Sequence, residues 1–313
     1  MGLLFAPLLS EETPGCRAAP TVPISGTLAG IRYDRTRPLA AQVTPLFDTK
    51  KPPTEARTFR VSYNGAKGSV PALLTIPGKG GKTAKRPPVV LLVHGLGGSK
   101  SSMLLLAVAF ARRGYATFAP DLPEHGDRRR GGDATIATMS LLETRRSVAV
   151  GVTDLRRGVD FLQTRPEIDG GKIGLVGVSL GGIYGAVLAG IEPRIAGTVL
   201  WSAGGDWGKL LTESRQRLAI RRRENGLPDA ETINKTLRDV DPVTYAPNIA
   251  PRPLLLLTGT SDSIVPNACT EALYDAAREP KTLERFPGGH VPDPRGMTVR
   301  TLRFFDETLK GRQ

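Results

Sequence analysis

Ser179 stands where a strand pattern turns sharply into a helix pattern. Residues 177–181 read Gly-Val-Ser-Leu-Gly, and they lie between the apolar run 172–176 and the small-residue stretch 182–190. A turn this tight lifts the serine hydroxyl above the strand end and crowds the positions two residues before and two residues after the serine, so only small residues fit there. We therefore interpret Ser179 as a candidate nucleophile. Two other serines lie near predicted strand ends without this glycine spacing, and we expect them to be structural: Ser202 and Ser261.

A carboxylate and an imidazole that could activate this serine occur later in the chain. Asp262 follows the buried-strand pattern of residues 253–258, and His290 lies in a Pro-Gly-Gly-His loop after a short strand pattern at 282–286. A serine hydroxyl is a weak nucleophile at neutral pH. It needs a base to take its proton and an acid to orient that base. We predict His290 as the general base and Asp262 as the acid.

The sequence offers alternatives for both partners. Asp206 follows the preceding strand and could supply the acid instead, although Asp262 has the better strand, turn and Val-Pro context. The chain contains three histidines. We expect His94 to fix a glycine-rich loop and His125 to bond backbone in another loop, which leaves His290 as the base.

Strand and helix patterns alternate along most of the chain. Two leading antiparallel strands are expected at 57–64 and 69–77. The later strands are expected at 88–94, 115–120, 172–178, 196–202, 253–258 and 281–286, and the helices at 101–113, 140–164, 181–191, 266–278 and 295–310. Such alternation predicts an α/β fold with a mostly parallel central sheet and helices on both faces. In the helix at 140–164 an apolar stripe should face the sheet, with arginines and aspartates facing water.

These motifs resemble the α/β-hydrolase superfamily, in which serine, acid and histidine follow one another in this order. Residues 115–127 are similar to a strand and the HG loop that follows it in that family. The dienelactone hydrolase and acyl-peptidase-like branch is resembled in three short segments: Arg86-Pro87-Pro88, Asp241-Pro242 and Asp262-Ser263-Ile264-Val265-Pro266. The resemblance extends over residues 57–311.

The resemblance implies an α/β-hydrolase fold and acyl transfer through a covalent intermediate. It also implies that the backbone N–H groups of Leu96 and Leu180 form the oxyanion hole. No cofactor and no metal is implied. The chain departs from the members named for dienelactone hydrolysis, which use a cysteine where this chain has Ser179. It also leaves no room for the additional propeller domain of the related peptidases.

Two segments do not follow the alternating pattern. Residues 1–55 are rich in proline, glycine and alanine, and we expect an arm that packs on the catalytic domain at 56–313 or is partly disordered. Residues 205–246 lie between two predicted strands and look helical. An insertion there would overhang the carboxyl ends of the strands, so we expect a small cap that shapes the acyl or alcohol pocket.

Composition agrees with a soluble globular enzyme. The chain has 313 residues, 40% of them hydrophobic and 23% charged. Its two cysteines, Cys16 and Cys269, are too few for a disulfide framework and lack metal-ligand spacing. The apolar N-terminus makes a poor signal peptide, because it lacks a basic region and soon meets two glutamates. No run approaches the length of a membrane span, and we expect a cytoplasmic protein.

The net charge of +13 requires an explanation. Its arginine clusters lie at 128–130, 145–146, 156–157 and 221–223, with little aromatic interleaving. We therefore expect a solvated basic surface and no nucleic-acid partner.

The preferred hypothesis is a metal-free serine carboxylesterase that acts on small-molecule esters with small or medium acyl chains. One alternative keeps the same triad but cleaves amides or peptides. The other is a non-catalytic α/β-hydrolase scaffold used for binding.

Overall fold

The computed structural model describes residues 26–47, 56–78, 86–129 and 140–311. Parts of the expected N-terminal arm, at 1–25 and 48–55, lie outside the described residues. So does Cys16.

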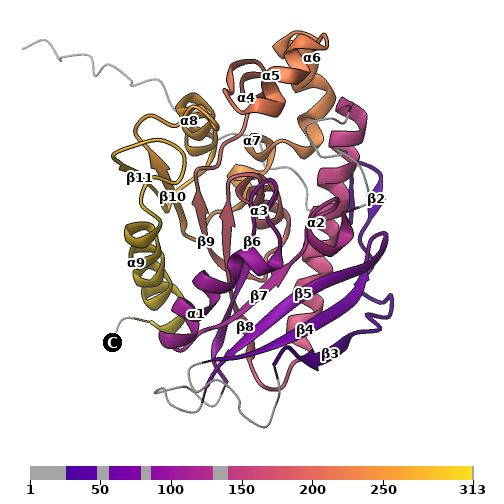
Figure 1. The fold of residues 1–313 in the computed structure, drawn as a ribbon, viewed down its shortest axis with the longest axis vertical. Helices are drawn as coiled ribbons and strands as arrows, with labels where there is room; N and C mark the ends of the chain where they lie inside the picture. Colours follow the sequence, from indigo (N-terminus) through magenta and orange to yellow (C-terminus); the bar gives the residue numbers. More distant parts are fainter. Residues whose placement is uncertain (1–25, 48–55, 79–85, 130–139, 312–313) are drawn as a thin grey trace, which may run out of the picture.

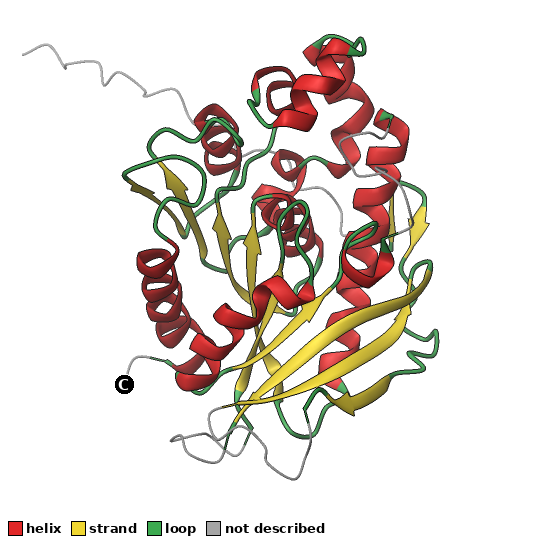
Figure 2. Cartoon of the chain, viewed as in Figure 1, coloured by secondary structure: helices red, strands yellow, loops and turns green. Residues whose placement is uncertain are grey.

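Within the described chain, nine strands form one sheet in the order β11-β10-β9-β8-β6-β7-β5-β4-β3. The pairs from β7 through β6, β8, β9 and β10 to β11 are parallel, whereas β3, β4 and β5 join antiparallel at one side. The expected α/β-hydrolase architecture is confirmed (Figures 1 and 2). The strands are β3 (Gln42–Pro45), β4 (Ala56–Gly65), β5 (Gly68–Pro77), β6 (Pro88–Val93), β7 (Ala116–Pro120), β8 (Asp169–Val178), β9 (Ile195–Trp201), β10 (Leu254–Gly259) and β11 (Lys281–Phe286).

Helices cover both faces of this sheet because its central strands are apolar on both sides. In β6, Val89, Leu91 and Val93 pack into one hydrophobic core, while Val90 and Leu92 pack into a second core on the opposite face. This alternation follows the two-residue period of a strand. The first core includes α2 (Leu141–Gln163), α3 (Leu180–Ile191) and α8 (Asn267–Ala276), and the second includes α1 (Leu104–Arg112) and α9 (Pro294–Phe305).

The segment between β9 and β10 is helical, as expected for the cap. In Figure 1, α4, α5 and α6 lie together at the top of the molecule. The last part of the segment does not overhang the sheet, because α7 and η4 pack against α3 and α8. The elements are α4 (Trp207–Glu213), α5 (Arg217–Glu224), α6 (Ala230–Leu237), η3 (Arg238–Val240), α7 (Pro242–Tyr245) and η4 (Ala246–Asn248).

Three boundaries differ from the expected ones by three residues or more. β8 starts at Asp169 rather than 172, since Asp169 pairs with Pro88 ahead of an irregularity in the ladder. A short 3-10 turn, η1 (Lys100–Met103), precedes α1. After α9, residues Asp306–Lys310 continue as a π-helical turn, η5.

Residues 26–47 form β1 (Thr27–Leu28), β2 (Ile31–Arg32) and β3, and they cover one side of α2. The expectation that the arginines and aspartates of α2 face water is wrong at four residues. Their exposed fractions are 2% for Asp154, 7% for Arg156, 2% for Arg157 and 5% for Asp160. Arg156 pairs with Glu192, and Arg157 pairs with Asp160. The N-terminal segment that buries these arginines carries no periodic signal of its own.

Arg157 binds this N-terminal segment to α2. Its guanidinium donates to the backbone carbonyls of Asp34 and Arg35 at 3.0 and 3.2 Å, and also to that of Arg37. The Nη1 atom that binds the carbonyls of Asp34 and Arg35 also donates to the Asp160 carboxylate at 2.7 Å. A planar group with five donors is suited to such a site, where several buried acceptors converge.

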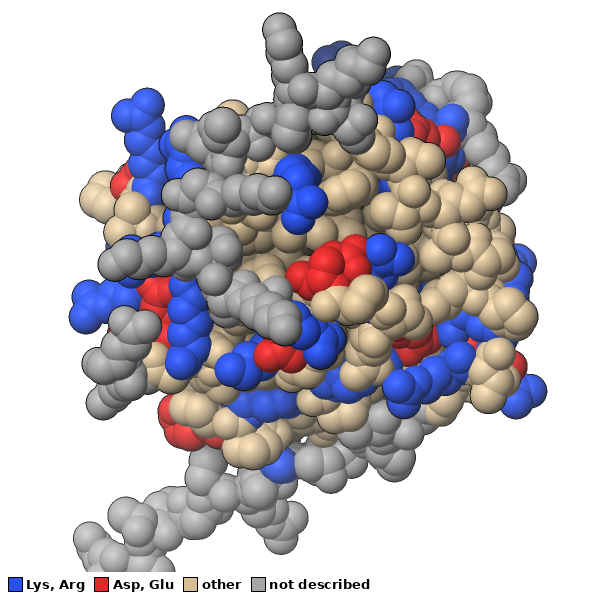
Figure 3. All heavy atoms as spheres, turned by 90° about the horizontal axis from the view of Figure 1, so that it is seen from below, with Lys and Arg blue, Asp and Glu red and all other residues tan. Residues whose placement is uncertain are grey.

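Much of the remaining positive charge lies on the surface. Figure 3, a view from below relative to Figure 1, shows basic side chains spread around this face with acidic ones among them. Within the described chain, no helix is long and apolar enough to cross a membrane.

We expect Arg157→Leu to lower the free energy of unfolding by about 3 kcal/mol, because it leaves buried carbonyls without donors. Urea denaturation measures the difference. Arg221→Ala is the matched control, since Arg221 is an exposed arginine and its removal should change stability by about 0.5 kcal/mol or less. An Arg157→Leu protein as stable as the control would contradict the anchoring role of Arg157.

Candidate active site

Ser179 occupies the turn between β8 and α3 with φ 54° and ψ −119°, a backbone conformation that non-glycine residues rarely adopt. Gly177 and Gly181, two residues away on either side, must be glycines for a steric reason. A Cβ at Gly181 would lie 2.2 Å from the carbonyl oxygen of Val93, and one at Gly177 would lie 2.5 Å from that of Gly181. The side chain of Ser179 makes no capping bond to α3, so its hydroxyl is available for other partners.

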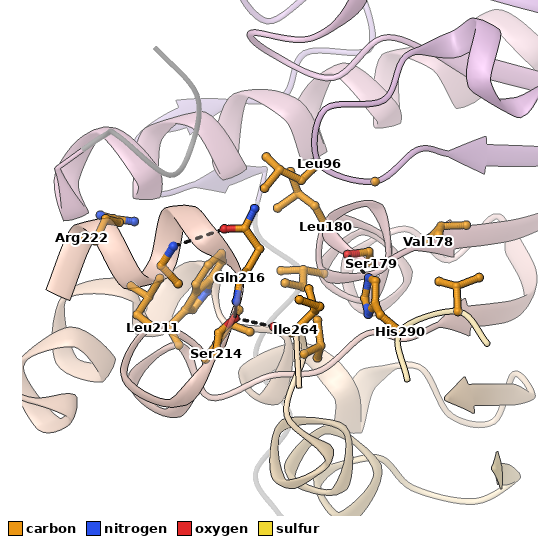
Figure 4. Close-up of a pocket in the computed structure, with 17 residues that line it drawn as sticks. Leu96, Val178, Ser179, Leu180, Leu211, Ser214, Gln216, Arg222, Ile264 and His290 are labelled. Carbon is orange, nitrogen blue, oxygen red and sulfur yellow. Dashed lines mark hydrogen bonds between the residues drawn. The ribbon is translucent and has the colours of Figure 1, made fainter. Parts of the chain in front are cut away.

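The three predicted triad residues come together at the carboxyl edge of the sheet. The distance from Ser179 Oγ to His290 Nε2 is 2.9 Å (Figure 4). His290 Nδ1 lies 2.8 Å from Asp262 Oδ2. Because an ionised carboxylate only accepts hydrogen bonds, Nδ1 carries the proton toward Asp262. Nε2 is then free to accept from the serine hydroxyl.

The carboxylate of Asp262 is oriented by the backbone that follows it. Its side chain has no exposed surface, and Oδ1 accepts from the N–H groups of Ile264 and Val265 at 2.9 and 3.0 Å. Oδ2 is thereby directed at the imidazole. The His290 side chain retains 23% exposure. The Asp262 carboxylate is therefore held in one orientation and excluded from solvent, while the His290 imidazole borders the pocket.

The loop that carries His290 crosses close to the end of β10. The N–H of Ser261 donates to Gly288 O at 2.9 Å, and a Cβ at Gly259 would lie only 1.8 Å from Gly289 O. A glycine at the end of β10 is thus required for the acid and base loops to lie side by side. Ser261 contributes its backbone to this arrangement.

Leu96 and Leu180, the residues expected to supply oxyanion donors, both line the cavity beside Ser179. Leu180 is the first residue of α3, where N–H groups have no acceptor within the helix. Leu96 lies in the loop after β6, which is closed by a bond from Gly98 N to Gly95 O at 3.0 Å. The loop after β6 and the start of α3 therefore both border the cavity beside Ser179.

His94 fixes this loop, as expected from the sequence. It is fully buried, its Nδ1 lies 2.9 Å from Gly95 O, and its Nε2 lies 3.1 Å from the N–H of Leu122. The N–H of Leu122 can only donate, so the ring must be neutral with its proton on Nδ1. Burial lowers the pKa of His94 from 6.5 to about 4, which keeps the ring in that form.

A buried ion pair fixes the other side of the loop. Asp121, after β7, accepts from both the backbone N–H and the ammonium of Lys100 at 2.7 Å. It also accepts from the N–H of Asp127 at 2.9 Å. The loops that follow β6 and β7 are therefore joined as one unit.

The alternative acid and base do not reach Ser179. Asp206 caps α4, where it accepts from Lys209 N and Asn234 Nδ2. His125 lies 2.7 Å from Pro123 O through Nδ1. Cys269 is buried, and burial raises its pKa to about 12, so its thiol stays protonated. Within the described residues, no group of His, Cys, Asp or Glu is arranged to hold a metal ion.

A cavity of about 350 Å³ opens beside the hydroxyl of Ser179. Figure 4 shows Leu96, Leu180 and Ile264 close to Ser179, with Gln216 and Arg222 toward the cap. Most of the lining is apolar: Leu96, Val178, Leu180, Ile183, Trp207, Leu210, Leu211, Ala219, Ile264, Val265 and Val291. Such a lining suits an apolar group next to the reacting carbonyl.

The cap residues of the cavity were not identified from the sequence. Trp207, Leu210 and Leu211 line the cavity from α4. Their helical spacing of three and four was the available signal. The cap is tied to the acid loop by Ser214 Oγ, which donates to Ile264 O at 2.6 Å, and by Arg215 N, which donates to Ser263 O at 2.7 Å.

The depressed pKa of His94 predicts acid sensitivity. The unfolded chain takes up a proton near pH 6.5 and the folded chain only near pH 4, so acidification in this window favours unfolding. We expect this histidine to reduce the free energy of unfolding by up to about 3 kcal/mol between these pH values. Urea denaturation of wild type and His94→Gln across pH 4–7 measures it. Equal pH dependence in the two proteins would show that His94 does not contribute.

Comparison with known proteins agrees with this fold. Residues 72–290 match the model of the Dienelactone hydrolase family. A protein of Bacillus subtilis (strain 168) with the name "Putative esterase YitV" is 26% identical over 238 residues, which cover 71% of this chain and 89% of that protein.

Solved structures with the same fold include two esterases. The acetyl xylan esterase from Paenibacillus sp. R4 is 24% identical with a TM-score of 0.74, over 87% of this chain and 90% of that one. Acetyl xylan esterase 1 from Thermoanaerobacterium sp. JW/SL YS485 is 17% identical with a TM-score of 0.69, over 90% of each chain. The family match covers more than half of the chain and bears out the predicted resemblance. The chain therefore belongs to the dienelactone hydrolase family and is an esterase-type hydrolase.

Proposed function

We propose that this protein hydrolyses carboxylic esters of small to medium acyl chains through an acyl-enzyme formed on Ser179. The observation that supports this most directly is the continuous hydrogen-bonded series from Asp262 through His290 to Ser179 beside an apolar cavity. No other serine of the described chain has both an imidazole partner and the glycine-flanked turn.

In the first half of the reaction, Ser179 Oγ attacks the ester carbonyl carbon while His290 Nε2 takes the hydroxyl proton. Asp262 keeps Nδ1 protonated and stabilises the imidazolium that forms. The N–H groups of Leu96 and Leu180 bind the negative oxygen of the tetrahedral intermediate, and loss of one such donor typically costs about 3 to 4 kcal/mol. The alcohol leaves with the proton from His290, and the acyl group stays on Ser179.

In the second half, water attacks the acyl-enzyme. His290 Nε2 takes a proton from this water and returns it to Ser179 Oγ as the carboxylic acid departs. The chemistry uses one base twice, so the imidazole must stay near both the serine and the entering water. Its partial exposure at the edge of the cavity is compatible with both tasks.

The apolar cavity supports an acyl group of limited length. Val178, Leu180 and Ile183 line the cavity from the turn and α3, and α4 and α5 of the cap contribute Trp207, Leu210, Leu211, Ala219 and Arg222. Two structural neighbours are named as acetyl xylan esterases, which agrees with short acyl groups. The volume of about 350 Å³ leaves room for longer, medium chains as well.

Ser179→Ala should reduce hydrolysis of p-nitrophenyl acetate by at least about a thousandfold, because the acyl-enzyme cannot form. A fluorophosphonate probe should label Ser179 alone in the wild-type protein. Ser261→Ala is the control, since Ser261 lies nearby but bonds through its backbone. A folded Ser179→Ala protein with full activity would rule out this function.

The acyl limit should depend on Ala219, a buried cavity-lining residue of α5. Ala219→Phe fills the cavity, so we expect kcat/KM for p-nitrophenyl octanoate to fall roughly tenfold or more while that for the acetate stays unchanged. Ile220→Phe is the control, because Ile220 is on the same helix, 37% exposed and outside the lining. Equal chain-length profiles for the two variants would exclude this part of the cavity as the acyl pocket.

A further inference from the structure

The dipeptide Trp201–Ser202, where β9 ends, bonds to Ser179 itself, to the strand that precedes Asp262 and to the residue that follows His290. The carbonyl of Trp201 accepts from the N–H of Ser179 at 2.8 Å. The N–H of Ser202 donates to Leu257 O on β10, the strand before Asp262, at 2.7 Å. The hydroxyl of Ser202 accepts from the N–H of Val291, the residue after His290, at 3.0 Å.

The backbone conformation of Ser202 indicates why a serine, and not a glycine, occupies this position. Ser202 has φ 46°, in the left-handed region that glycine adopts without penalty, and it is fully buried. A serine at such a position costs conformational energy relative to glycine, so the hydroxyl must contribute something that glycine cannot. The structure gives it one clear function, which is to bind Val291.

Val291 needs such a partner. It is a β-branched residue with φ 50°, a conformation that is strained for this residue type and persists only when its surroundings impose it. A relaxed backbone at Val291 would rotate the peptide next to His290. The imidazole would then shift relative to Ser179 Oγ, which now lies 2.9 Å from Nε2.

We propose that Ser202 is a positioning residue, whose hydroxyl holds the strained backbone at Val291 and so keeps the imidazole of His290 aligned with Ser179. The inference rests on the proposed function, since it assigns Ser202 to the same reaction. It gives Ser202 a role beyond the structural one expected from its lack of glycine spacing.

The test compares Ser202→Gly with wild type. Glycine relieves the positive φ but lacks the hydroxyl, so stability is preserved while alignment is lost. For p-nitrophenyl acetate we expect kcat to fall by roughly 10- to 100-fold with KM changed less than about twofold, since small misplacements of reacting groups have effects of this size. Labelling of Ser179 by a fluorophosphonate should slow by a similar factor, with the melting temperature near that of wild type.

Thr258→Val is the matched control. Thr258 lies on the neighbouring strand β10, is fully buried, and its hydroxyl has no hydrogen-bond partner within the described chain. Its removal should leave kcat and the labelling rate unchanged. Ser202→Ala, which keeps a side chain but removes the acceptor, should repeat the loss of kcat and serves where Ser202→Gly does not fold.

A folded Ser202→Gly or Ser202→Ala protein with kcat within about twofold of wild type would overturn the inference. An equal loss in Thr258→Val would overturn it as well, because the effect would then belong to any buried hydroxyl. The proposed function fails separately, since it falls only if Ser179→Ala retains activity. If Ser179→Ala is inactive and Ser202→Gly is fully active, only the positioning role of Ser202 is excluded.

Discussion

The site depends on the absence of side chains where α3 meets the end of β6. A single methyl group at Gly181 would stand 2.2 Å from the Val93 carbonyl, so the turn at Ser179 could not form. The same close approach brings the loop after β6, with Leu96, next to the hydroxyl. One steric requirement thus exposes the hydroxyl of Ser179 and brings to it the loop proposed to supply an oxyanion donor. The buried His94 and the pair of Lys100 with Asp121 then fix that loop from behind.

The parallel pairing of strands β8 to β11 brings Ser179, Asp262 and His290 to the same edge of the sheet. β8, β9, β10 and β11 are consecutive neighbours, and their carboxyl ends lie at one edge of the sheet. Ser179, Asp262 and His290 follow β8, β10 and β11, so residues far apart in sequence need only short loops to meet. The strand between, β9, ends in the dipeptide that bonds to the neighbouring loops through Trp201 and Ser202.

The sequence predicts features that depend on local pattern, namely the alternation of strands and helices, the glycine-flanked serine and the loops that carry Asp262 and His290. Features that depend on contacts between distant segments of the chain cannot be predicted from such local patterns. Arg157 reads as a solvated residue because its partners at 34–37 carry no periodic signal. The same holds for β3, whose four residues gain their conformation by pairing with β4. Ser202 is another example, since its bond to Val291 spans 89 residues.

The cap is bonded to the edge of the sheet that carries Asp262 through Ile264. Ile264 donates its N–H to Asp262 and accepts the hydroxyl of Ser214 on its carbonyl, so one residue connects the acid to the cap. Elsewhere the cap contributes mainly apolar side chains to the cavity. Substitutions at Leu211 or Ala219 can therefore change the shape of the pocket without altering the hydrogen bonds that orient Asp262 and His290. The shape of the pocket can thus vary while the bonds that join Ser214, Ile264 and Asp262 are kept.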